Sequence, residues 1–155
     1  MKILILGSGG REHSLAWAIK QNPKCDKLLC APGNAGMAQI AGCHDLDIFD
    51  AAAVVAFAES QNIDLVVIGP EAPLVADVGG ACRSAGILTF GPDKAVAQLE
   101  ASKNFTKEIC TQGGIPTAAY AYFRDAATAK TYVQRQGTPI VVKADGLAAG
   151  KGVFI

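Results

Sequence analysis

The sequence predicts an α/β fold: a doubly wound parallel sheet followed by the incomplete start of a second unit. Short runs rich in Ile, Leu and Val alternate with helix-like segments through residues 1–101, the order expected of a parallel sheet with helices on both faces. Turns rich in glycine or proline follow three of these runs, at the strand ends where open α/β sheets bind ligands. The chain has 155 residues, 50% of them hydrophobic, which is enough for one well-buried domain with residues left over.

The first unit is expected to contain five strands, at residues 3–6, 27–31, 43–48, 64–69 and 87–90. The fourth is the clearest because its interior is apolar and β-branched, whereas the third is short and is expected at the sheet edge. Helices are predicted at 14–21, 51–59, 93–100 and in a segment ending at Ser84. Asp50 is the predicted N-cap of the second helix, and Leu15, Ala16, Trp17 and Ile19 are expected on the inner side of the first.

The pattern changes after residue 101, so we place domain boundaries at 1–101 and 102–155. Ser102 is expected to cap a helix that runs to about Thr111, and Asp125 to cap another that ends near Gln136. Strands are predicted at 120–123 and 139–143.

Composition excludes several classes of protein. The 14 basic and 14 acidic side chains cancel, so no net charge draws the chain to nucleic acid or to an anionic membrane. No apolar run is long enough to span a membrane and no signal peptide is recognised, so we expect a cytoplasmic location. The five cysteines form no C-x-x-C pair and are expected to be small buried hydrophobic residues, and a histidine-based metal site is not expected.

A glycine turn follows the first predicted strand. Gly7, Gly9 and Gly10 let backbone N–H groups approach an anion, and the next helix adds roughly half a unit of positive charge. Arg11 can close over such a ligand with a bidentate fork. A dinucleotide fingerprint requires glycine where Glu12 stands and an acid after the second strand, so NAD binding is the weaker interpretation. The alternative is that the glycines only make a tight turn.

Two further loops leave the same predicted sheet edge. Asn34, in the turn 32–36, offers a hydrogen-bond donor and an acceptor, although a plain turn would use the same residues. The loop 69–74 contains two prolines, which are expected to fix its shape without secondary structure. Its Glu71 can accept bonds from a sugar hydroxyl or an amine, or can be a solvated surface acid.

A second glycine loop follows the predicted strand that ends at Lys143. Residues 143–152 superficially resemble a Walker A loop, but only three residues separate Gly146 from Gly150, and Gly152 stands where Ser or Thr should be. Apolar strand residues follow this loop, so the sequence favours a hairpin that folds over polyphosphate, with Lys143 and Lys151 supplying charge. An exposed glycine hairpin without a ligand is the alternative.

Together these stretches closely resemble the N-terminal part of the phosphoribosylamine–glycine ligase (glycinamide ribonucleotide synthetase) family, in the ATP-grasp superfamily. Matching motifs occur in the family's order at residues 7–13 (GSGGREH), 32–34 (PGN), 69–74 (GPEAPL), 102–105 (SKNF) and 143–152 (KADGLAAGKG). The resemblance implies a Rossmann-like domain followed by the start of an ATP-grasp domain. It also implies an ATP-dependent ligase that joins glycine to 5-phosphoribosylamine in purine biosynthesis, through a glycyl-phosphate intermediate.

The resemblance carries site residues over by position, without assigning a catalytic residue. It implies that 5-phosphoribosylamine is bound by Gly9, Gly10, Arg11, Glu12, His13, Pro32, Gly33, Asn34, Gly69, Pro70, Glu71, Pro73 and Leu74. It implies that ATP is bound by Lys103, Lys143, Asp145, Gly146, Gly150, Lys151 and Gly152.

The family's Mg²⁺ or Mn²⁺ ligands and most of its glycine pocket are expected beyond Ile155. No metal site is therefore expected here, and the chain, which ends in an unpaired apolar strand, is expected to be truncated and inactive alone. The expected partners are small-molecule substrates, with the oligomeric state left open. Another ATP-grasp ligase or carboxylase, or a non-catalytic nucleotide-binding module, are the alternatives. The Arg11–Glu12–His13 run and the second phosphate loop favour the ligase.

Overall fold

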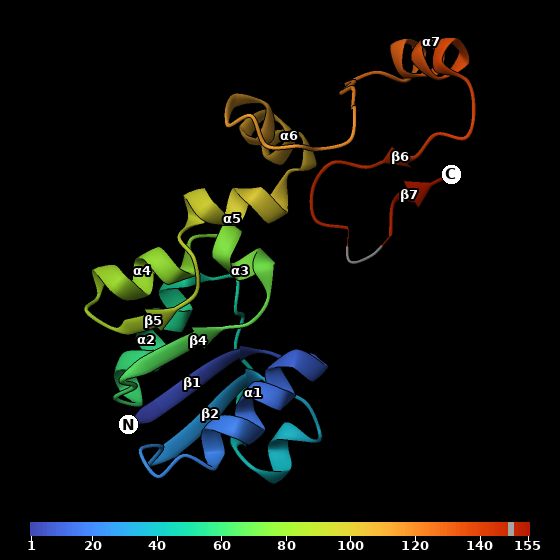
Figure 1. The fold of residues 1–155 in the computed structure, drawn as a ribbon. Coiled ribbons are helices and arrows are strands. Elements are labelled where there is room, and N and C mark those ends of the chain that lie inside the picture. The colour runs from blue at the N-terminus through green and yellow to red at the C-terminus, as the bar shows by residue number, and fades with distance from the viewer. Residues whose placement is uncertain (149–150) are drawn as a thin grey trace. The chain divides into compact units, whose positions relative to one another are not determined.

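The computed structural model describes residues 1–148 and 151–155. The chain divides into two compact units, residues 1–97 and 98–155, and the helix α5 (Lys94–Ala101) contains the boundary. Each unit is described by itself below (Figure 1).

The first unit is built on a five-stranded parallel sheet in the order β3-β2-β1-β4-β5. Its strands are β1 (Lys2–Gly7), β2 (Lys27–Pro32), β3 (Gly42–Cys43), β4 (Leu65–Ile68) and β5 (Leu88–Phe90). The order reverses direction on either side of β1, so the carboxyl ends of β1, β2 and β4 meet at one edge of the sheet. The predicted doubly wound parallel sheet is confirmed.

The strands are buried on both faces, which explains their unbroken apolar sequences. In β1, Leu4 and Leu6 pack in a core with the helices α2 (Ala51–Ser60) and α4 (Val78–Ser84). The alternate residues Ile3 and Ile5 pack on the opposite face with α1 (Gly10–Lys20) and the 3-10 turn η1 (Met37–Gln39). Full burial of such a side chain stabilises the fold by about 1.5–3 kcal/mol.

Local signals set the helix starts in both units. The Asp50 carboxylate accepts hydrogen bonds from the N–H groups of Ala52 and Ala53, as predicted for an N-cap. In the second unit, the Ser102 hydroxyl caps α6 (Lys103–Gln112) and Asp125 caps α7 (Ala126–Gln136), again as predicted.

Three predictions for the first unit are wrong in detail. The first helix begins at Gly10 instead of Ser14, and Trp17, expected on its inner side, is 61% exposed, whereas Ala16 is buried. Of the predicted strand 43–48, only Cys43 lies in a strand, the two-residue β3, which does lie at the sheet edge. The segment 69–74 contains the short helix α3 (Glu71–Val75), because Pro70 and Pro73 occupy the N-cap and first turn, where proline is tolerated.

The second unit contains α6, α7 and a two-stranded antiparallel sheet of β6 (Val142–Lys143) and β7 (Val153–Phe154). The predicted strand–glycine loop–strand arrangement is therefore observed, although β6 is shorter than the predicted strand 139–143. Residues 120–123 form no strand, because no other strand of the described chain pairs with them. None of the described residues in this unit is fully buried.

The cysteines differ in exposure. Cys30 and Cys82 are buried and Cys25 and Cys110 half-buried, but Cys43 is exposed, contrary to the expectation that all are buried. Through the described part of the chain, every helix is too short or too polar to cross a membrane.

Candidate functional site

A cavity of about 480 Å³ lies at the carboxyl ends of β1, β2 and β4. Four predicted site residues line it, namely Gly9, Glu12, Pro32 and Pro70. The rest of its wall is Gly7, Ser8 and the segment Asp45–Phe49. That last segment was predicted to be a strand and not part of the site, although the polar residues Asp45 and Asp47 on either side of Leu46 were a signal for it.

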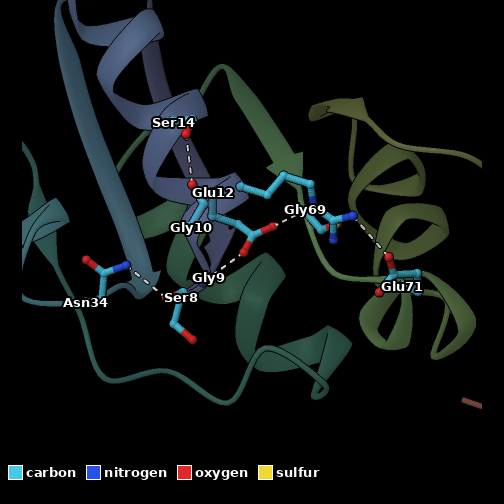
Figure 2. Close-up of polar contacts among 9 residues, drawn as sticks. Ser8, Gly9, Gly10, Glu12, Ser14, Asn34, Gly69 and Glu71 are labelled. Atoms are coloured by element: carbon cyan, nitrogen blue, oxygen red, sulfur yellow. Dashed lines mark hydrogen bonds and ion pairs between the residues drawn. The ribbon is translucent and has the colours of Figure 1, made fainter. Parts of the chain in front are cut away.

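Glu12 is the buried centre of this edge, with only 4% of its surface exposed. Its carboxylate accepts the backbone N–H of Gly9 at 2.8 Å (Figure 2). It also accepts the Nε–H of Arg11 at 3.0 Å. Glu12 is the third residue of α1, so its carboxylate satisfies a backbone donor that the helix itself leaves unpaired. A carboxylate of the protein itself therefore occupies part of the turn that is predicted to bind an anion.

The same carboxylate explains two of the glycines around it. A Cβ on Gly7 would lie 2.5 Å from Glu12 Cγ, and a Cβ on Gly69 would lie 2.3 Å from Glu12 Oε1. Any side chain there would displace a buried carboxylate. By contrast, a Cβ on Gly10 would meet no atom within 4 Å, so the first turn of α1 is open at that residue.

Arg11 joins the start of α1 to the segment that contains Gly69 and Glu71. Its Nη1 donates to Glu71 Oε1 at 3.1 Å and its Nη2 donates to the carbonyl of Gly69 at 2.6 Å, while Nε binds Glu12. The hydrogen bonds to Glu12 and Glu71 raise the pKa of the guanidinium. Glu71 in turn has a lowered pKa, owing first to its own backbone N–H and then to Arg11. The pair is therefore fully ionised at neutral pH.

Asn34 ties a third loop to the glycine turn. Its amide Nδ2 donates to the carbonyl of Ser8 at 2.9 Å (Figure 2). Its Oδ1 accepts the N–H groups of Gly36 and Met37, each at 2.9 Å. The Asn34 side-chain oxygen, which was predicted to accept a hydrogen bond from a ligand, thus accepts two hydrogen bonds within its own loop. Gly33, at φ +73°, adopts a left-handed conformation that glycine tolerates, and its N–H donates to the carbonyl of Gly7.

Three other predicted residues pack away from the cavity wall. A Cβ on Gly36 would lie 2.3 Å from the imidazole of His13, which therefore packs on that loop. Pro73 is fully buried, and Leu74 belongs to the hydrophobic core that includes α2 and α4. The packing of these three predicted substrate residues is therefore explained without a ligand.

In the second unit, the glycine hairpin is fastened to the start of α6. Asp145 accepts hydrogen bonds from the Ser102 hydroxyl at 3.0 Å and from the N–H of Lys103 at 2.6 Å, and the Lys103 ammonium donates to the carbonyl of Gly146 at 2.8 Å. Partial burial would raise the pKa of Asp145, but these hydrogen bonds outweigh it and lower the pKa. Three predicted ATP-binding residues, Lys103, Asp145 and Gly146, are thus brought together with Ser102 at the base of the hairpin.

The other predicted ATP-binding residues lie along the hairpin. Lys143 and Lys151 are exposed, and neither ammonium group forms a hydrogen bond or ion pair with a described residue. Gly152, at φ +72°, accepts the N–H of Ala144 at 2.8 Å, which closes the hairpin. Gly150 lies outside the described residues.

A divalent cation requires several oxygen, nitrogen or sulfur ligands close together. Over residues 1–148 and 151–155, no group of three or more His, Cys, Asp or Glu side chains could hold a metal ion. The described residues therefore do not fit the Mg²⁺ or Mn²⁺ site that the resemblance places in the intact enzyme.

The model of the family "Phosphoribosylglycinamide synthetase, N domain" matches residues 1–100, and that of the "ATP-grasp (A) domain" of the same synthetase matches residues 101–155. The chain belongs to the phosphoribosylglycinamide synthetase family. This confirms the resemblance found in the sequence, since both halves match in the same order.

Relatives of this family cover the whole chain. The chain is 61% identical over 155 residues to the phosphoribosylamine–glycine ligase of Agrobacterium fabrum and 54% identical over 157 aligned residues to that of Vibrio cholerae, in each case across 37% of the relative. It is 56% identical over 148 residues to the chloroplastic enzyme of Arabidopsis thaliana, across 28% of that protein. The chain thus spans between 28% and 37% of the length of these relatives.

The crystal structure of phosphoribosylamine–glycine ligase from Thermotoga maritima superimposes with a TM-score of 0.76 at 31% identity, over 99% of this chain and 35% of that one. The fold extends beyond the family. The biotin carboxylase domain of a Hydrogenobacter thermophilus carboxylase, at 18% identity over 99% of this chain and 37% of that one, has a TM-score of 0.75. At that identity, the likeness shows the fold alone.

Proposed function

We propose that this chain forms the 5-phosphoribosylamine-binding part, and a portion of the ATP-binding part, of a phosphoribosylamine–glycine ligase. The reaction joins the carboxyl group of glycine to the amine of 5-phosphoribosylamine and converts ATP to ADP and phosphate. The observation that carries the proposal is the match of both halves of the chain, in order, to the two domains of one synthetase family. ATP activates the carboxylate, because phosphorylation turns a poor leaving oxygen into a good one.

Under this proposal, residues 1–101 bind 5-phosphoribosylamine and residues 102–155 bind the ATP phosphates. In the first part, the loops that hold Gly9 to His13, Pro32 to Asn34 and Gly69 to Leu74 receive 5-phosphoribosylamine. All three loops line a single cavity, and side-chain hydrogen bonds join them to one another, which supports the assignment. The open first turn of α1 at Gly10 and the half-exposed guanidinium of Arg11 are suited to its phosphate.

In the second part, the hairpin and α6 receive the ATP phosphates. Lys143 and Lys151 carry charge that no described residue neutralises, and Lys103 holds the base of the hairpin. Asp145, by contrast, caps α6 and is engaged with the protein's own N–H groups, so we assign it the positioning of the hairpin. Mg²⁺ or Mn²⁺ is required by the intact enzyme under this proposal, and no residue of this chain is assigned to it.

The proposal includes a cytoplasmic location, where ATP and the other small substrates are metabolites, and no nucleic acid or membrane partner. We also expect the 155-residue chain to be inactive alone, since it supplies no metal site in its described part. Turnover by the purified chain would overturn that expectation.

The test begins with the intact mass of the protein purified from its source, followed by an assay of phosphate release. The ligase predicts a longer polypeptide that releases phosphate only when ATP, glycine and 5-phosphoribosylamine are all present. Replacing glycine by bicarbonate distinguishes the ligase from a carboxylase of the same fold. Phosphate release with bicarbonate but without glycine would contradict the proposal, as would a full-length protein that hydrolyses no ATP with any of these substrates.

A further inference from the structure

Two cysteine side chains lie side by side at the end of the β2–β3 ladder. Cys30 and Cys43 are register partners in these parallel strands, so their side chains point to the same face of the sheet. Neighbouring strands lie about 4.8 Å apart, which falls within the Cα separations that disulfides span. A Cβ on Gly33 would lie 2.5 Å from Cys43 Sγ and 3.3 Å from Cys30 Cβ, so both side chains lie against the same glycine.

The two thiols differ in access to solvent. Cys30 is fully buried in the core on the α1 face, whereas Cys43 is exposed on a strand of only two residues. A solute can therefore reach Cys43 directly, whereas the Cys30 side chain is closed to solvent. Burial, and after it the neighbouring Cys43 thiol, raises the pKa of Cys30 to about 12. Because the thiolate is the nucleophile, Cys43 is the cysteine expected to attack an oxidant first.

We propose that Cys30 and Cys43 form an oxidisable dithiol that reacts with small disulfides of the glutathione class. The Cys43 thiolate attacks one sulfur of the small disulfide, forms a mixed disulfide and expels one thiolate. The Cys30 thiolate then attacks the Cys43 sulfur, forms the Cys30–Cys43 bond and expels the second thiolate. The two protons lost by the cysteines end on the two expelled thiols, so the protein loses two electrons and the small disulfide gains two.

A disulfide between Cys30 and Cys43 would constrain a loop of the candidate site. The Cys43 Sγ lies 3.9 Å from the carbonyl oxygen of Asn34, and residues 30 and 43 flank the loop that contains Pro32, Gly33 and Asn34. A disulfide would close that loop covalently and hold the edge strand to β2. This inference is independent of the proposed function, because it rests only on the two side chains and their strands.

The remaining cysteines provide internal controls. Cys25 follows α1, Cys82 lies in α4 and Cys110 lies in α6, so no strand register joins any of them to Cys43. Cleavage after Met37, Lys27 and Glu59 leaves Cys30 alone on residues 28–37 and Cys43 alone on residues 38–59. A disulfide between them is therefore identified without ambiguity by mass spectrometry.

The experiment treats the folded 155-residue chain with oxidised glutathione, quenches with acid and alkylates the free thiols in denaturant before cleavage. The expected result is the joined peptide pair 28–37 and 38–59, lighter by two hydrogens than the sum of its parts, with Cys25, Cys82 and Cys110 alkylated. In Cys30→Ser, Cys43 is expected to retain glutathione; in Cys43→Ser, Cys30 is expected to stay alkylatable; Cys25→Ser should behave as the wild type.

The proposal is overturned if Cys43 of the wild-type chain retains glutathione while Cys30 is alkylated, or if Cys43 pairs with another cysteine or with a second chain. It is also overturned if neither cysteine is oxidised under conditions that oxidise a small dithiol. If Cys30→Ser does not fold, the wild-type and Cys43→Ser digests decide the question, because Cys43 is exposed and its replacement leaves the core intact.

Discussion

The carboxylate of Glu12 accepts the backbone N–H of Gly9 at 2.8 Å, at the start of α1, where a bound anion would otherwise be expected. Asp145 has the same relationship to the start of α6, through the N–H of Lys103. In each unit, an acidic side chain of the protein thus satisfies the first donors of a helix beside a glycine loop. A ligand phosphate must then use the donors that remain, such as Gly10 and the basic side chains.

Replacing Glu12 by alanine should destabilise the first unit by about 1–3 kcal/mol, because the buried carboxylate is removed and the Gly9 N–H and the Arg11 Nε–H lose their acceptor. Glu12→Gln should recover part of this loss, since the amide oxygen still accepts one bond. The measurement is the free energy of unfolding in urea. Glu59→Ala, at an exposed position on α2, is the matched control and should change it little. Equal stability of Glu12→Ala and Glu59→Ala would show that Glu12 does not support the turn.

Gly69→Ala and Gly10→Ala form a second matched pair. The new Cβ at residue 69 would lie 2.3 Å from Glu12 Oε1, and overpacking of this kind costs about 1–3 kcal/mol. The new Cβ at residue 10 meets nothing within 4 Å and replaces a helical glycine, so it should be neutral or stabilise by about 0.5–1 kcal/mol. Thermal unfolding of the two variants tests this order. The packing argument is wrong if Gly10→Ala is the less stable variant.

The contact between Asp145 and α6 should depend on pH in a defined direction. The pKa of Asp145 is lowered in the folded chain, so the ionised contact contributes fully above the ordinary aspartate pKa of about 3.9 and is lost as the pH falls through the lower, folded value. The amide NMR signals of Ser102, Lys103 and Asn104 should therefore move together in that acidic range. Asp145→Asn should abolish this movement, and an unchanged titration in that variant would rule out the carboxylate as its cause.

Arg11→Ala should weaken binding of ribose 5-phosphate, a stable analogue of 5-phosphoribosylamine, by about tenfold or more, since charged hydrogen bonds to phosphate are the strong ones. Arg11→Lys should restore only part of the affinity, because an ammonium cannot reproduce the planar fork. Titration calorimetry gives the dissociation constants, with the exposed Arg124→Ala as the control. Similar affinities for the Arg11→Ala and Arg124→Ala chains would remove Arg11 from the proposed site.

The sequence predicted those parts of the molecule that local patterns determine. The continuous apolar sequences of β1 and β4 predicted a parallel sheet, because strands buried on both faces have apolar residues at every position. The caps at Asp50, Ser102 and Asp125 were predicted because each carries its own acceptor at the start of a helix. Each of these features is determined by a few consecutive residues, so it can be recognised in the sequence alone.

The parts that were missed depend on contacts distant in sequence. The sequence placed Glu12 where a dinucleotide fingerprint has glycine, but did not predict its burial, which depends on Gly69 in another loop. The strand expected at 120–123 had suitable residues but finds no pairing strand among the described residues. The cavity wall at Asp45–Phe49 was hidden because alternating apolar and polar residues are typical of an edge strand as well as of an irregular segment.

The most direct test of the central claim is to map ribose 5-phosphate onto the 155-residue chain by amide NMR. The account predicts that the largest shifts fall on the loops around the carboxyl ends of β1, β2 and β4, with Gly10 and Arg11 among them and α7 unaffected. Shifts confined to the second unit, or no shift in these loops at saturating ligand, would contradict the assignment of this cavity to 5-phosphoribosylamine.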